Sequence, residues 1–210
     1  MSLEESTMDV HRIQLKIFAQ PGFAFDTHRS VRVFHRWIKE RLLPEQVIDV
    51  ADYSHVHRGP RVALIGHGSD HYLDEGEGRS GLLYFRKRAA PPPHQRLSDA
   101  FRRCLTAARL LEQDPGFDAP PKFGTGELLL RFVDRLQAPN TDAGYEPLRE
   151  SIEHFLLELY RKPVQIVREG SEREVLSLRI RAEEAPTLDV LLERLGGSLV
   201  LPKKRLLKLA

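Results

Sequence analysis

The stretch FHRWIKERLLPEQVI, residues 34–48, has a counterpart in EHFLLELYRKPVQIV, residues 153–167. In both stretches a histidine stands nine residues before a proline, and an apolar pair follows that proline. An apolar segment that ends near a proline precedes each stretch, at residues 13–19 and 128–136. Recurrence of the same features at the same spacing predicts an internal duplication.

The two copies differ in one region, which we call the insertion (residues 49–80). The second copy passes from Val167 to Arg173 in a tight turn, whereas the first copy spans residues 49–79 at the same place. Segments that connect regular elements vary freely and often carry function. We therefore expect the functional surface of the protein in the insertion.

Hydrophobic periodicity predicts the same order of elements in both copies: strand, helix, strand, strand, helix. The expected elements are 11–19, 30–43, 47–51, 81–87 and 94–113 in the first copy, and 127–136, 143–161, 164–168, 173–181 and 187–195 in the second. An extra strand is expected at 62–65. Since a strand–helix–strand step favours a parallel crossover, we expect an α+β fold. Its mixed sheets would be covered by helices and related by a pseudo-twofold axis.

Composition shifts divide the chain into four parts. The first repeat unit covers 11–114, a linker rich in proline and glycine covers 115–126, and the second repeat unit covers 127–197. Residues 198–210 form a basic, apolar tail. This tail is a candidate docking segment for a partner or an acidic membrane surface. A last strand or a disordered terminus are the alternatives.

The composition limits the classes of partner. Of the 210 residues, 41% are hydrophobic and 30% are charged, and the net charge is only +2. No overall field steers such a chain to nucleic acid, so we do not expect a nucleic-acid partner. No apolar run approaches the roughly 20 residues of a membrane helix, and the acidic start of the chain lacks a signal-peptide core. We expect a cytoplasmic protein without a transmembrane segment.

Cysteine content excludes two further classes of site. Cys104 is the single cysteine, so an intrachain disulfide and a cysteine-based zinc cluster are both excluded. Any metal site would therefore depend on histidine and carboxylate ligands.

The insertion holds a set of candidate functional residues. Asp49 or Asp52 could orient His55 or His67 as a general base. A structural Asp–His hydrogen bond is the more common meaning of such a pair. The candidate functional cluster comprises Asp49, Asp52, Tyr53, His55, His67 and Arg79.

A divalent metal is the cofactor that the insertion suggests. Four of the nine histidines fall within residues 55–71, and zinc or iron accepts imidazole nitrogen and carboxylate oxygen. Their spacing matches no established ligand motif, and exposed loop histidines are the alternative. The candidate ligands are His55, His57, His67, Asp70 and His71.

One stretch of the insertion resembles a known group of sequences. Residues 49–56 (DVADYSHV), Gly59-Pro60, Gly66-His67 and residues 78–84 (GRSGLLY) are similar to a family of uncharacterised bacterial proteins. The resemblance implies a bacterial origin. It implies no activity, cofactor or partner.

Two hypotheses of function follow. The first is a non-catalytic ligand-binding, partner-binding or regulatory protein that uses the insertion, because no motif completes a catalytic set. The alternative is a metal-dependent, hydrolase-like enzyme that uses His55, His67, His71 and Asp70. Convergence of at least three of these side chains on one point would favour the enzyme.

Overall fold

The computed structural model describes residues 10–56, 59–88 and 91–196. The strands are β1 (Ile13–Ala19), β2 (Val47–Asp52), β3 (Pro60–Gly66), β4 (Ser69–Asp74), β5 (Gly81–Arg86), β6 (Phe123–Phe132), β7 (Gln165–Glu169) and β8 (Leu176–Arg181). The helices are α1 (Thr27–Glu40), α2 (Pro93–Gln113), α3 (Asp142–Tyr160) and α4 (Leu188–Arg194), with a short 3-10 turn, η1 (Gly76–Gly78). The expected α+β class is thus observed.

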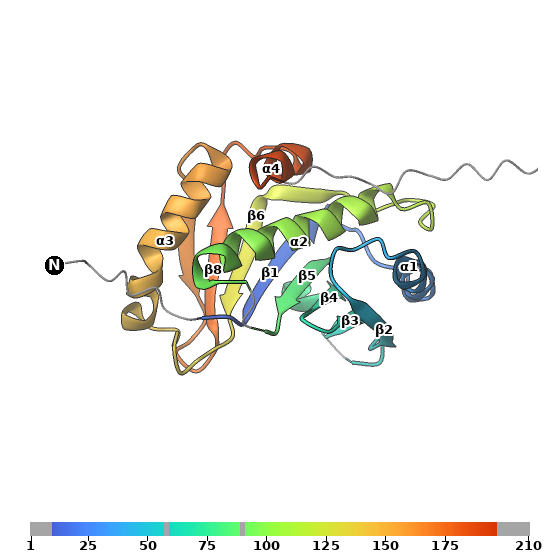
Figure 1. Cartoon of the computed structure of the whole chain (residues 1–210), viewed down its shortest axis with the longest axis horizontal. Coiled ribbons are helices and arrows are strands. Elements are labelled where there is room, and N and C mark those ends of the chain that lie inside the picture. The colour runs from blue at the N-terminus through green and yellow to red at the C-terminus, as the bar shows by residue number, and fades with distance from the viewer. Residues whose placement is uncertain (1–9, 57–58, 89–90, 197–210) are drawn as a thin grey trace, which may run out of the picture.

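All eight strands join one sheet, in the order β2-β3-β4-β5-β1-β6-β8-β7. Every neighbouring pair is antiparallel. The helix α2 runs across the middle of the sheet and packs on β1 and β5, while α1 packs on β2 and β3 (Figure 1). The helix α4 contacts both α2 and α3.

One core lies between the sheet and the helices. Ile13, Leu15 and Ile17 alternate along β1 and point into it, as the period-2 pattern predicts. Trp37 of α1 and Cys104 of α2 are both fully buried in this core. The same hydrophobic cluster continues through the side chains of β6, β8, α3 and α4. Both halves of the chain therefore contribute to a single core.

The prediction of mixed sheets is wrong. It assumed that α1 and α3 connect neighbouring parallel strands. The helix α1 instead links β1 to β2, which have β3, β4 and β5 between them. The helix α3 links β6 to β7, which are separated by β8. Each crossover skips strands, and hairpins then fill the gap, so only antiparallel neighbours result.

The insertion contains two strands where the sequence predicted one. The strand β3 matches the expected extra strand, but residues 69–74, expected as a loop, form β4. The sequence SDHYLD of β4 has no β-branched residue and so gives little local strand signal. Pairing with β3 on one side and β5 on the other supplies what the local sequence lacks.

The second half departs from expectation mainly at its first strand. The strand β6 begins at Phe123 and ends at Phe132, so part of the predicted linker belongs to the sheet. Thr187 caps α4 as predicted, accepting a hydrogen bond from the Val190 N–H. The predicted tail at 198–210 lies outside the described residues. Among the described residues, no helix is long and apolar enough to cross a membrane.

Candidate functional site

The first group of predicted site residues lies where β2 turns toward β3. Asp49 is exposed on the edge strand β2, and its carboxylate accepts a hydrogen bond from the next residue's N–H (2.8 Å). The Asp52 carboxylate accepts one from the Ser54 N–H (2.8 Å), which lowers the pKa of Asp52. Tyr53 and His55 are exposed, with ring centres 6.4 Å apart. Both carboxylates therefore bind backbone N–H groups of their own segment, and the Asp52 contact is that of an Asx turn.

His67 lies at the other end of β3. It is exposed in the turn to β4, and its N–H donates to the Gln46 carbonyl (3.0 Å). The seven residues of β3 at about 3.3 Å each put His55 and His67 roughly 20 Å apart. The structure therefore does not bring these two histidines, or Asp52 and His67, into one site. His57 lies outside the described residues.

One face of the sheet carries the core and the helices. The opposite face, which no described helix covers, is called the open face here. Lys16 points to it, because it alternates with the core residues Leu15 and Ile17. Its cross-strand partners Leu83 and Leu129 lie in the same row.

Asp70 and His71 are successive residues of β4, so their side chains leave opposite faces of the sheet. Asp70 lies on the open face, where it accepts hydrogen bonds from the Gly66 N–H (3.0 Å) and the Tyr72 hydroxyl (2.9 Å). It also pairs with Lys87 (2.8 Å). Within the described part of the chain, no three His, Cys, Asp or Glu side chains form a group that could hold a metal ion.

Arg79 is a predicted site residue that lies in a larger cluster. Its guanidinium is 4.1 Å from the centre of the Phe18 ring on β1, and it pairs with Glu127 of β6 (2.9 Å). Arg179 of β8 lies over the same ring at 5.3 Å and pairs with the same Glu127 oxygen (3.1 Å). The insertion is thus joined to the second half of the chain.

Lys16 anchors the loop after β4 to this cluster. The side chain is fully buried, and its Nζ lies 2.5 Å from the Asp74 carboxylate and 2.8 Å from the Gly76 carbonyl. A buried charge is strongly destabilising unless it is paired in this way. A Cβ at Gly81 would lie 3.0 Å from the Lys16 side chain and 2.5 Å from the Ile17 carbonyl. Glycine at this position therefore lets β5 approach β1 closely.

Glu77 of η1 also belongs to this cluster. It adopts φ +59° in η1, a left-handed conformation that costs a residue with a side chain roughly 1–2 kcal/mol. Its carboxylate forms an ion pair with Arg131 and lies 3.9 Å from Lys16 Nζ. These residues form what we call the Phe18 cluster: Lys16, Phe18, Asp74, Glu77, Arg79, Glu127, Arg131, Glu169 and Arg179.

The charges of the Phe18 cluster are paired with one another. Arg179 also binds Glu169 of β7 (2.8 Å), and this hydrogen bond lowers the pKa of Glu169. The sequence did not mark Lys16, Arg131 and Arg179 as candidate site residues. Each occupies a polar position of an alternating strand, which places it on one face but does not reveal its neighbours.

A second polar cluster lies within the core. His71 is fully buried and pairs across the strands with Tyr84, their ring centres 5.2 Å apart. The flanking residues in the same row are Leu64 and Leu15. His71 Nε2 is 3.2 Å from a carboxylate oxygen of Glu45, although the two atoms are not aligned as a hydrogen bond. Burial lowers the pKa of His71 below its ordinary value.

Asp99 of α2 connects this cluster to the helix layer. It forms ion pairs with Arg86, with Arg102 (2.8 Å) and with Arg103 (2.8 Å). Arg103 also binds the second oxygen of Glu45 (2.8 Å). Burial alone would raise the pKa of Asp99, but the three guanidinium groups outweigh it and hold that pKa low. We call Glu45, His71, Tyr84, Arg86, Asp99, Arg102 and Arg103 the His71 cluster.

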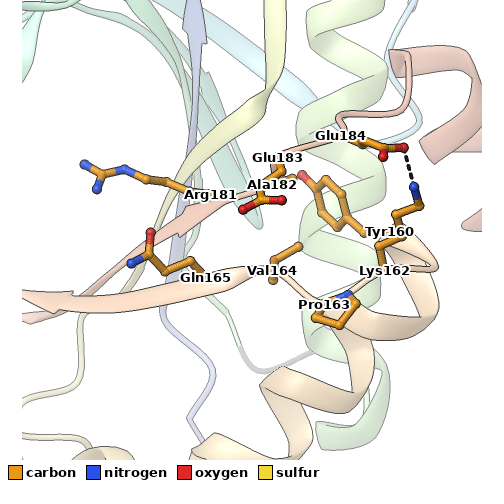
Figure 2. A pocket seen from close by; sticks show the side chains of 9 residues that line it. All are labelled: Tyr160, Lys162, Pro163, Val164, Gln165, Arg181, Ala182, Glu183 and Glu184. Carbon is orange, nitrogen blue, oxygen red and sulfur yellow. Dashed lines mark hydrogen bonds and ion pairs between the residues drawn. The ribbon is translucent and has the colours of Figure 1, made fainter.

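A cavity of about 730 Å³ lies at the end of the β7–β8 hairpin beside the C-terminus of α3. It adjoins the Phe18 cluster at Arg181, which lines it and pairs across the strands with Glu127. Figure 2 shows the ion pair between Lys162 and Glu184 at its side. The Tyr160 hydroxyl donates to the Thr125 carbonyl (2.8 Å). The residues that line the cavity all follow α3 or belong to its last turn, so the insertion contributes none of them.

No family model, curated protein or solved structure matches this chain. The resemblance to an uncharacterised bacterial family therefore stays a prediction. Function has to be argued from the chemistry of the sites.

Proposed function

We propose that the protein is a non-catalytic binding protein, and that another protein binds its open face at the insertion. The observation that carries this proposal is the Phe18 cluster. Through Arg79 and Glu77, the insertion is fixed by ion pairs to Glu127 and Arg131 of the second half. A fixed loop presents the same surface at every encounter, which lowers the entropy cost of binding.

The residue types around the Phe18 cluster suit a protein partner. Tyr72, Leu83 and Phe85 lie half-buried on the open face, and the Arg12 guanidinium lies 5.6 Å from the Phe85 ring centre. Aromatic residues and arginine are enriched where proteins bind one another. Together with the Phe18 cluster, these side chains form a broader surface that combines charged, aromatic and aliphatic groups.

The charge balance favours a protein over nucleic acid. The Phe18 cluster holds four cations and four anions that pair with one another. Phosphate backbones are bound by an excess of basic groups. The Phe18 cluster has no such excess. A small molecule would favour a concave site, and no residue of the insertion lines the cavity described above.

The enzyme alternative ranks lower. It requires at least three of His55, His67, His71 and Asp70 to converge, whereas the described residues place them at two ends of β3 and on two faces of β4. The cytoplasmic location inferred from the sequence stays a prediction.

We also propose that the two halves derive from one duplicated unit. The central strands β1 and β6 are neighbours, and each is flanked by the last strand of its own half, β5 or β8. Each half then ends in a helix, and these helices, α2 and α4, pack together. On this view the β3–β4 hairpin entered between β2 and β5, where the second half joins β7 directly to β8.

Site-specific photo-crosslinking tests the binding proposal. A photoreactive residue would replace Tyr72 or Leu83 on the open face, and Leu157, which is 48% exposed on α3, would serve as the control position. We expect Tyr72 and Leu83 to capture the same discrete protein in cells, identified by mass spectrometry, and Leu157 not to capture it. The proposal fails if the α3 position captures it equally or the open-face positions capture nothing.

A further inference from the structure

We propose that the His71 cluster is an acid-sensitive joint, which holds the insertion against α2 and opens when His71 takes up a proton. The joint is independent of the binding partner proposed above. It can therefore be tested on the purified protein, and its failure leaves that proposal standing.

The position of His71 is the first argument. It lies in a row of the sheet that is otherwise apolar on both sides of the His71–Tyr84 pair, with Leu64 on β3 and Leu15 on β1. Neither ring nitrogen has a hydrogen-bond partner among the described residues. A neutral imidazole in such a place is already unfavourable, and an imidazolium is far more so.

The charges around His71 are the second argument. The charged and titratable groups around it are Glu45 from the α1–β2 connection, Asp70 beside it on β4, Tyr84 and Arg86 on β5, and Asp99, Arg102 and Arg103 on α2. Asp99 already holds three guanidinium groups. Glu45 gives one carboxylate oxygen to Arg103, and its other oxygen, 3.2 Å from His71 Nε2, is the acceptor left near the ring.

Asp70 cannot take over as a counter-ion. It points to the open face, where Lys87 and the Tyr72 hydroxyl bind it. A proton on His71 would therefore add a cation beside Arg103 with only a shared carboxylate to balance it. We infer that hydration of the cluster relieves this charge, and that it separates β4 from Glu45 and from α2.

The opening has a defined extent. His71 belongs to the insertion, Glu45 to the connection before β2, and Arg103 to α2, so loss of these contacts frees one side of β4. The Phe18 cluster on the opposite face has its own ion pairs and keeps its contacts to the second half. We thus expect a local loosening of the insertion rather than unfolding of the whole chain.

The experiment combines an NMR titration of the histidine rings with hydrogen exchange of the full-length protein, at pH values from about 7.5 to about 5. In the wild type we expect the His71 ring to gain its proton below pH 6.5, the ordinary pKa of histidine. Over the pH range in which the ring titrates, β4 amides should lose protection by up to roughly tenfold per pH unit. His71→Leu should keep β4 protected at the lower pH. His154→Leu, at a 72% exposed histidine of α3, should behave like the wild type.

Two results would overturn the proposal. One is that His71→Leu loses β4 protection in acid as the wild type does. The other is that the β4 amides lose protection over a pH range different from the range in which the His71 ring titrates. The second comparison uses only the wild type, so it decides the matter even if His71→Leu does not fold.

Discussion

The two polar clusters lie on opposite faces of the sheet, and they are built differently. The Phe18 cluster is a set of ion pairs in which Lys16, though fully buried, has a carboxylate and a carbonyl within 2.8 Å. The His71 cluster contains a buried ring whose two nitrogens lack hydrogen-bond partners among the described residues. The first is expected to hold its geometry over a range of pH, and the second to depend on pH.

The difference shows how burial changes the meaning of a polar residue. On the open face, Arg79 and Glu127 are each more than a quarter exposed and gain partners at a small desolvation cost. Beneath α2, Glu45 and Asp99 are almost fully buried, so every change of charge there alters stability.

Removal of the partner of Lys16 should have the largest effect. In Asp74→Ala the buried Lys16 side chain loses its carboxylate partner, which costs about 3–5 kcal/mol of unfolding free energy. Urea denaturation measures the change. The matched control is Glu184→Ala, which removes an exposed ion pair with Lys162 and should leave the midpoint unchanged. Equal midpoints for the two variants would contradict the role given to Lys16.

Gly81→Ala tests the close approach of strands at the Phe18 cluster. The new Cβ would lie 2.5 Å from the Ile17 carbonyl, and the backbone shift it forces should cost about 1–3 kcal/mol. Thermal unfolding measures the loss. Gly68→Ala, where a Cβ meets nothing within 4 Å, serves as the control. A stable Gly81→Ala protein would show that β1 and β5 can move apart freely.

His71→Leu should flatten the acid limb of the stability curve. Burial lowers the folded-state pKa of His71 below 6.5, so below pH 6.5 the unfolded chain binds a proton that the folded chain does not. Stability of the wild type should therefore fall with falling pH in that window, by at most about 1.4 kcal/mol per pH unit from this residue. Urea midpoints at several pH values measure it. An unchanged slope in the variant would rule out His71 as the source.

Arg131→Ala should change stability least. The guanidinium is about one-fifth exposed and pairs with Glu77, so we expect a loss below about 1 kcal/mol. Capture of the partner from position 72 should nonetheless fall, because η1 loses one of its attachments. Arg149→Ala, at an exposed pair on α3, is the control for capture. If both variants capture equally, η1 does not shape the binding surface.

Local pattern predicted most elements but not their arrangement. The alternation of β1 and the apolar stripe of α2 gave bounds within two residues of those observed. The strand β4 was missed, since pairing on both sides creates it. The strand order also depends on contacts between distant residues, such as β1 with β6, and no local period contains that information.

The candidate site was predicted only in part. The insertion was singled out from the spacing of two similar sequence stretches, and Arg79 does lie in the Phe18 cluster. His67 and His55 were grouped because they are near in sequence, yet a whole strand separates them. Lys16 and Arg179 were overlooked because isolated charges in strands carry no motif, and only the register brings them to Phe18.

The most direct test of the central claim is hydrogen exchange of the protein with and without the partner captured from the open face. Binding there predicts added protection in β4, η1, β5 and β6, with α1 and α3 unchanged. Protection confined to α3 or to the cavity beside Lys162 would contradict the account, because it would place the partner away from the insertion.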